Sequence, residues 1–154
     1  MRKTLFLLLL CCASFLTACS SLPDGVQKPS LKINDLTSER VNNIPGFNVS
    51  YTIMHKTPEP LPLQELKFEV FVNGKIAGVL VIEPEEKIPS NIENHYEQFV
   101  PANKLPPVAA DSLQTPMLKI AGKVDLTMVV DDSEKTQFLN QKDTYEGLIH
   151  AAGE

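Results

Sequence analysis

Apolar and polar residues alternate along most of the chain beyond residue 30, with the period of two that is typical of strands buried on one face. In the clearest run, Phe47, Val49, Tyr51 and Ile53 are separated by single polar residues. This pattern predicts about seven short strands, over residues 31–34, 47–53, 66–72, 76–82, 96–100, 118–128 and 147–151.

The residues between these runs predict how the strands connect. Asn73-Gly74 is the strongest short-range hairpin signal, because both residues accept positive φ. Gly78, inside the returning strand, indicates a β-bulge. Prolines fall in the proposed loops and not in the middle of a strand. We therefore expect an all-β fold, an antiparallel fibronectin/immunoglobulin-like β-sandwich of about seven strands. Residues 109–114 are the one short helix expected.

The beginning of the chain has the pattern of a bacterial export signal. Arg2 and Lys3 form a positive region, residues 5–16 an apolar region, and Leu16-Thr17-Ala18-Cys19 has the form of a lipobox. Polar residues follow at once, so the apolar run is shorter than the roughly 20 residues of a comfortable membrane span. An ordinary cleaved signal and a single uncleaved anchor helix are the alternative interpretations.

Cys19 is the predicted lipid-attachment residue, since a thiolate is the nucleophile that accepts the diacylglycerol. Together the attached chains would hold the protein on the membrane permanently. The expected organisation is a lipoprotein signal peptide over residues 1–18, a lipidated tether over 19–29 and one domain over 30–152. Ser20, which is not aspartate, resembles the sorting residue of outer-membrane lipoproteins. We expect a bacterial envelope protein at the outer membrane, facing the periplasm.

Cysteine content and charge narrow the function further. Cleavage before Cys19 leaves 136 of the 154 residues, enough for one domain with its own core. Cys11 and Cys12 would leave with the signal, and the thiol of Cys19 would carry the lipid. No free thiol would remain in the mature chain, which excludes disulfides and thiol catalysis. The mature chain has 12 basic and 19 acidic residues, a formal charge of −7. Such an acidic chain argues against nucleic acid as a partner.

The sequence has no convincing metal or catalytic site. His55, His95 and His150 lie far apart and lack the spacing of metal ligands. His95, between Glu93 and Glu97, is the best candidate ligand, but a solvated position is the favoured interpretation.

Two acidic runs raise similar questions. Residues 131–134 offer carboxylates for calcium but lack the glycine of a calcium loop, so an acidic turn is favoured. The glutamates of residues 83–86 are interpreted as solvated rather than as a glycosidase pair. We therefore expect no enzyme activity, no metal and no cofactor.

Two segments are candidate partner surfaces. Residues 76–82 carry apolar side chains on both faces of one strand, so something should cover the second face. Residues 58–63 have a Pro-x-Pro-x-Pro spacing that favours an exposed polyproline conformation with two leucines. For the first segment the favoured interpretation is an inner strand covered by the tether or by residues 105–113. For the second segment it is a rigid connection between two strands. The candidate residues are Pro58, Pro60, Leu61, Pro62, Val79, Leu80 and Val81.

The order of features resembles the water stress and hypersensitive response (WHy) domain, which is shared with folded late embryogenesis abundant (LEA) proteins. The resemblance is carried by the proline-rich loop at residues 58–63, residues 66–78, Ile88-Pro89, residues 118–124 and Tyr145-Glu146-Gly147, and it spans about residues 29–151. One departure is at His55-Lys56-Thr57, where the family usually has Asn-Pro-Asn. The resemblance implies a fibronectin-like β-sandwich, no catalysis and a role in desiccation and related stress.

Two functions follow as expectations. The first is a lipid-anchored envelope protein that protects envelope proteins or the membrane under water loss. The second is an accessory lipoprotein that docks on an envelope protein assembly. An enzyme is the weakest interpretation, and the sequence names neither the partner, the stress nor the oligomeric state.

Overall fold

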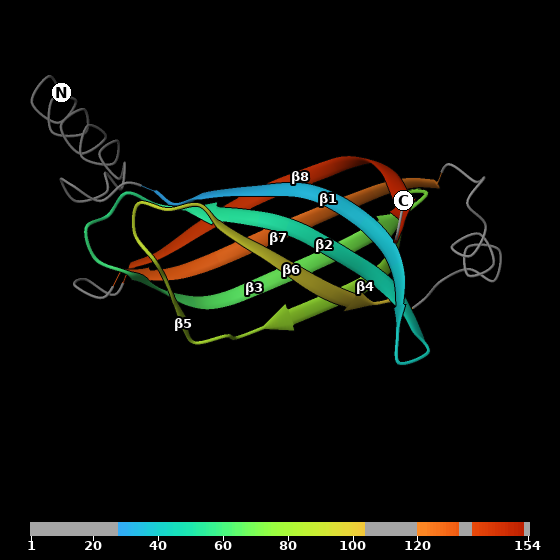
Figure 1. Cartoon of the computed structure of the whole chain (residues 1–154), viewed down its shortest axis with the longest axis horizontal. Coiled ribbons are helices and arrows are strands. Elements are labelled where there is room, and N and C mark those ends of the chain that lie inside the picture. Colours follow the sequence, from blue (N-terminus) through green and yellow to red (C-terminus); the bar gives the residue numbers. More distant parts are fainter. Residues whose placement is uncertain (1–27, 104–119, 133–136, 153–154) are drawn as a thin grey trace, which may run out of the picture.

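Eight β-strands make up the regular structure in the part of the chain that the computed structural model describes, which is residues 28–103, 120–132 and 137–152 (Figure 1). The strands are β1 (Ser30–Val41), β2 (Ile44–Met54), β3 (Leu61–Val72), β4 (Lys75–Ile82), β5 (Glu86–Ile88), β6 (Asn94–Pro101), β7 (Ile120–Asp132) and β8 (Gln137–Ala151). The all-β class expected from the alternating pattern is confirmed, with one strand more than the expected seven. The expected helix at residues 109–114 lies outside the described residues.

Two tight turns connect the long hairpins. Asn73-Gly74 joins β3 to β4 with φ angles of 49° and 75°, so the predicted hairpin is confirmed. Asn42-Asn43 joins β1 to β2 with φ angles of 51° and 67°. Asparagine is among the few residues with a side chain that tolerate this left-handed backbone, and these two turns therefore fix the register of both hairpins.

The strands follow one path, β4-β3-β7-β8-β1-β2-β6, and β5 also pairs with β3. Neighbours are antiparallel except β1 and β8, which pair in parallel at Thr37↔His150 and Ser38↔Ala151. The sheet is therefore mixed, and its pairing does not confirm the antiparallel fibronectin/immunoglobulin-like sandwich that we expected.

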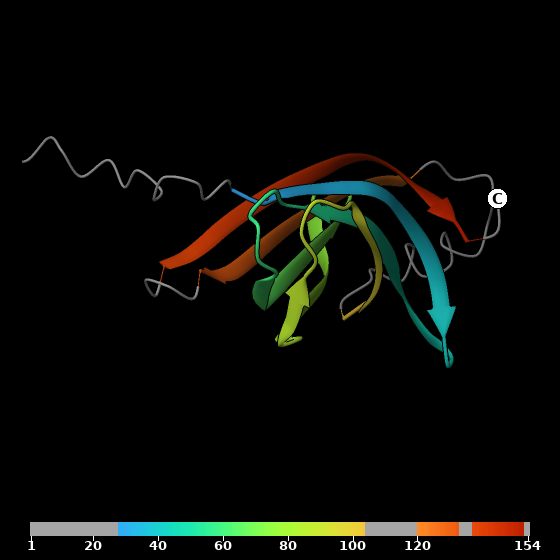
Figure 2. The ribbon, with the colours of Figure 1, turned by 60° about the vertical axis from the view of Figure 1, so that its left-hand side comes forward.

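The sheet curls so strongly that its two ends come together. Figure 2 shows β1, β2 and β8 arching over β3, β4 and β6. Tyr51 on β2 meets Phe68 on β3 edge-to-face, with ring centroids 5.5 Å apart, although three strands separate them along the path. The concave side of the curl therefore encloses the core.

Alternate residues of each strand fill that core. Phe47, Phe68, Leu36, Ile53 and Leu126 are among its largest fully buried side chains. The side chains between them face outward and are half-buried or exposed, with the buried Asp125 on β7 as an exception. Burial of so many apolar groups is the main stabilising contribution to a fold of this kind.

Three β-bulges interrupt the regular pairing. The register shifts at Asn34 in β1, at Gln64 in β3 and at Ala77 in β4, each of which is an extra residue with no partner opposite it. The third bulge lies directly beside Gly78, where the sequence predicts one. Each bulge changes the spacing of inward-facing residues from two to three, as between Leu63 and Leu66.

Candidate functional site

The candidate apolar strand, which is β4, lies at one end of the sheet path rather than inside it. Val79 and Val81 point outward and are 37% and 49% exposed. Leu80 points the other way, is half-buried and packs against the core. The structure thus confirms apolar side chains on both faces of this strand. The favoured inner position is wrong, because β4 is an edge strand among the described strands.

The proline-rich segment is divided by the fold. Pro58 and Pro60 are exposed in the connection between β2 and β3. Leu61 begins β3 opposite Ile88 and is only 4% exposed, and Leu63 is also buried. Pro62 lies between them in the strand, half-buried. The expected exposed polyproline segment with two available leucines is therefore wrong, because both leucines belong to the core.

Cys19, the predicted lipid-attachment residue, lies outside the described residues. In the described part of the chain, no helix is long and apolar enough to cross a membrane.

His55 occupies a position that sequence reasoning did not single out as structural. It is 1% exposed, and its Nε2–H donates a hydrogen bond to the Ile88 carbonyl at 2.7 Å. The His55 carbonyl in turn accepts a hydrogen bond from the Asn91 N–H at 2.9 Å. His55 therefore fastens the β5 region to the end of β2. The sequence signal for this role was the departure from the resembled family at residues 55–57, where this chain has His55-Lys56-Thr57 in place of Asn-Pro-Asn.

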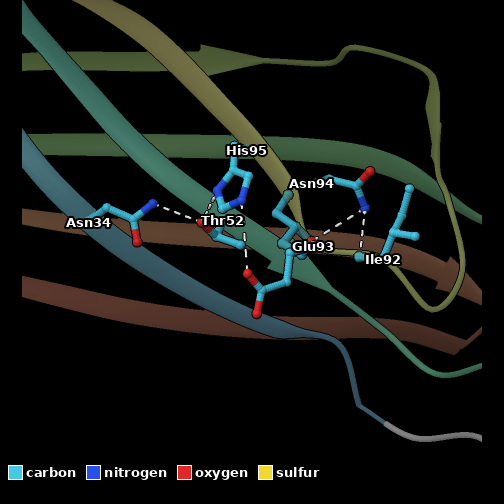
Figure 3. A network of polar contacts seen from close by, with 7 residues as sticks. Asn34, Thr52, Ile92, Glu93, Asn94 and His95 are labelled. Atoms are coloured by element: carbon cyan, nitrogen blue, oxygen red, sulfur yellow. Dashed lines mark hydrogen bonds and ion pairs between the residues drawn. The ribbon is translucent and has the colours of Figure 1, made fainter.

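His95 takes part in a short polar network on the surface (Figure 3). Its Nδ1 lies 2.9 Å from the Thr52 hydroxyl, which accepts a hydrogen bond from the Asn34 side chain at 2.8 Å. Its Nε2 lies 3.9 Å from the Glu93 carboxylate. The favoured solvated position of His95 is confirmed, and this network connects β1, β2 and β6.

Metal-binding geometry is not found among the described residues, where no group of three His, Cys, Asp or Glu side chains is placed to hold an ion. Asp131 lies in β7, where it pairs with Phe138 of β8. Ser133 and Glu134 of the predicted acidic turn lie outside the described residues. Glu83, Glu85 and Glu86 are exposed, as their interpretation as solvated charges requires.

A buried carboxylate lies on the outward-facing side of β7, a position for which the apolar pattern predicts a solvated side chain. Asp125 is 9% exposed, and its Oδ1 accepts a hydrogen bond from Thr144 at 2.8 Å. Lys123 and Lys142 lie 3.2 and 3.6 Å from its Oδ2. Burial alone would raise the pKa of Asp125, but the hydrogen bonds from Thr144 and Lys123 and the charges of both lysines outweigh it and lower the pKa. The cluster links β7 to β8 through side-chain contacts.

Two tyrosines form the aromatic part of the region between β2 and β6. Tyr51 and Tyr96 are stacked with ring centroids 5.4 Å apart. Burial raises the pKa of Tyr51 well above its usual value, and the neighbouring Tyr96 and Glu86 raise it further. Burial and the charge of Glu86 also raise the pKa of Tyr96. Both hydroxyls therefore stay protonated, and neither is set up as a base.

Comparisons with known proteins bear on the fold. No protein-family model matches the sequence, and no curated protein matches it either. Among solved structures, AT1g01470 from Arabidopsis thaliana superimposes with a TM-score of 0.63 at 14% identity, covering 91% of this chain and 91% of that chain. A structure described as a late embryogenesis abundant (LEA) protein, At2g46140.1, superimposes with a TM-score of 0.61 at 13% identity, covering 97% of this chain and 84% of that one. The chain therefore has the fold of these LEA-type structures over nearly its whole length.

Proposed function

We propose that this protein is a lipid-anchored, non-catalytic member of the bacterial envelope that protects envelope proteins or the membrane during desiccation or related stress. The observation that carries the proposal is the LEA-type fold, which extends over 91% and 97% of the chain in the two comparisons. The WHy-like order of motifs supports the same assignment, and the lipobox at Cys19 supports the anchor.

The surface chemistry is consistent with protection rather than catalysis. The chain carries a formal charge of −5 before any processing, and charged surfaces of one sign resist association and keep proteins dispersed. The buried His55 and Asp125 serve the fold through hydrogen bonds, and Asp125 also through ion pairs with Lys123 and Lys142. In this role the protein acts through its surface and needs no cofactor.

The test is suppression of aggregation. The protein should reduce the light scattering of an unrelated enzyme after drying and rehydration, and an equal mass of an acidic β-protein of another fold is the control. Equal scattering with both proteins would contradict the proposal.

Anchoring is tested separately. Cys19→Ala should abolish incorporation of labelled fatty acid and leave the chain unprocessed, whereas Cys12→Ala should change neither. Continued lipid labelling of the Cys19 variant would contradict the anchor and leave the stress role open.

A second function is favoured by one observation. Val79 and Val81 are exposed next to each other along an edge strand, where a protein partner would find apolar contacts. An accessory lipoprotein that docks on an envelope assembly would use this strand. Chemical cross-linking in intact cells distinguishes the two functions, since an accessory protein should be captured with one dominant partner and a protective protein with many.

A further inference from the structure

The two ends of the strand path, β4 and β6, lie beside each other and leave a seam in the curled sheet. Within the described residues β4 pairs only with β3, and β6 pairs only with β2. The short strand β5 also pairs with β3. The two strands approach each other around Gly78, and just beyond the end of β6 the Asn103 N–H donates to the Ala77 carbonyl at 2.8 Å. A Cβ atom at Gly78 would lie 2.7 Å from the Pro101 carbonyl oxygen. In Figure 1 the ribbons are well apart where β4 ends and β6 begins.

The edge of β4 that faces away from β3 has no strand partner within the described residues, and it offers backbone hydrogen-bonding groups toward this seam. Asn103 contacts the Ala77 carbonyl through its N–H and the Val79 carbonyl through its side-chain amide at 3.4 Å. These carbonyls therefore point away from β3. Because backbone groups alternate in direction along a strand, the N–H and C=O of Val81 point the same way. Beyond Asn103 the described strands place no partner on this edge.

Apolar side chains flank the free edge on both sides. Val79 and Val81 are exposed on the outer face, while Leu80 and Ile82 are half-buried on the inner face. Tyr96, half-buried on β6, packs against the core, and the nearby carboxylate of Glu86 on β5 contributes to raising its pKa. An added strand would find apolar contacts for the side chains of both its faces.

The charges around the seam are mainly negative. The strands at its edges and the residues between them carry five carboxylates and two lysines, which are Glu83, Glu85, Glu86, Glu93, Glu97, Lys75 and Lys87. Such a surface attracts positively charged residues and repels negatively charged ones.

We propose that the seam between β4 and β6 binds an extended, positively charged peptide segment of another protein, which pairs with the edge of β4 at Val81. Main-chain hydrogen bonds to the edge supply affinity in this mode of recognition, and side chains supply specificity. A second copy of this chain is the less suitable occupant, because it would bring the same carboxylates face to face. The inference rests on the second proposed function, for which it names the kind of partner that β4 would bind, and it requires neither the anchor nor the stress role.

The test uses the full chain purified in mild detergent and a fluorescent peptide of alternating valine and lysine. Fluorescence anisotropy should show binding that weakens as salt is added, and at least about tenfold weaker binding of a valine and glutamate peptide. Val81→Pro removes the outward N–H without touching the β3 pairing, and Glu86→Lys reverses one charge of the seam. Each variant should weaken binding of the lysine peptide about tenfold or more.

A matched control and a measurement on the unaltered protein complete the test. Glu146→Lys makes the same charge change on an exposed site of β8, separated from β4 by β7 and β3, and should leave binding unchanged. Hydrogen exchange of the wild-type protein should show slower exchange at the Val81 amide when the lysine peptide is present. No binding, equal affinity for both peptides, or a Val81 amide already protected without peptide would each overturn the proposal. Formation of a dimer through β4 would also overturn the proposal and would identify a second copy of this chain as the occupant.

Discussion

The side chain of Asp143 accepts a hydrogen bond from the backbone N–H of Ile33 at 2.7 Å, and it thereby joins β8 to β1 where their backbones do not pair. The contact lies directly beside the bulge at Asn34, where β1 shifts its register against β2. A bulge leaves ladder groups without partners, and the Asp143 carboxylate supplies one.

We expect Asp143→Ala to lower the free energy of unfolding by about 1–3 kcal/mol, because the Ile33 N–H would lose its acceptor. Urea unfolding followed by circular dichroism measures the change. Asp143→Asn keeps an acceptor oxygen at the same place and should recover most of the loss. An alanine variant as stable as the wild type would show that water replaces the carboxylate.

His55→Ala should be more costly, by about 2–4 kcal/mol, since it removes a buried side chain together with the hydrogen bond to Ile88. The β5 region should also become more sensitive to limited proteolysis. His95→Ala changes an exposed histidine and should alter stability by less than about 0.5 kcal/mol. Similar losses of unfolding free energy in both variants would contradict the inference that His55 holds the β5 region against the end of β2.

Gly78→Ala tests the contact between the two sheet edges. The new methyl group would lie 2.7 Å from the Pro101 carbonyl oxygen, and the strands must separate to admit it. We expect a loss of about 1–3 kcal/mol in urea unfolding. Gly74→Asn is the control, because asparagine tolerates the positive φ of 75° and nothing lies within 4 Å of its Cβ position. A neutral Gly78→Ala would mean that β4 and β6 are not held together at this point.

The lowered pKa of Asp125 predicts a dependence of stability on pH. A carboxyl group with a lower pKa in the folded state than in the unfolded state stabilises the fold above its unfolded pKa of about 4, and this contribution disappears as the pH falls through the folded pKa. The difference in unfolding free energy between wild type and Asp125→Asn should therefore shrink between pH 7 and pH 2. A constant difference across this range would show that hydrogen bonding, not charge, holds the cluster.

The three tyrosines, Tyr51, Tyr96 and Tyr145, all have a raised pKa, chiefly because they are buried. The tyrosinate absorbance of the folded protein should therefore appear at higher pH than in urea, and the last group to ionise should be missing in Tyr51→Phe. Since the neutral form is favoured in the fold, stability from these groups is lost as the pH rises above about 10. Coincident titration curves in buffer and in urea would contradict the burial of these hydroxyls.

Regular alternation predicted β2, β6 and β7, which lack a bulge, and bulges explain where the prediction of β1 and β3 stopped. The extra residue at Asn34 ends the period of two that Leu31 and Ile33 begin, so the rest of β1 was not recognised. The bulge at Gln64 separates Leu63 from Leu66 in the same way, and the first residues of β3 were interpreted as a proline loop. A single inserted residue is enough to reverse the apparent face of a strand.

Polar residues at inward positions hid most of β8. Gln141 and Asp143 stand opposite Met128 and Leu126, where the pattern requires apolar residues. Asp143 is there for its bond to Ile33, which sequence periodicity cannot reveal. The candidate site was predicted in part for a similar reason: the apolar pattern of β4 is local, whereas its place at the edge depends on which distant strands pair.

The parallel pair of β1 and β8 also determines how the domain would respond to a pulling force. β1 begins at one end of the sheet and β8 ends at the other, as the left and right sides of Figure 1 show. A force applied between residues before Ser30 and residues after Ala151 would slide these two neighbouring strands along each other. The hydrogen bonds between them would then be loaded in shear and would break together rather than one after another. A domain held at its N-terminal side would therefore resist mechanical extension, a property governed by its unfolding rate rather than its equilibrium stability.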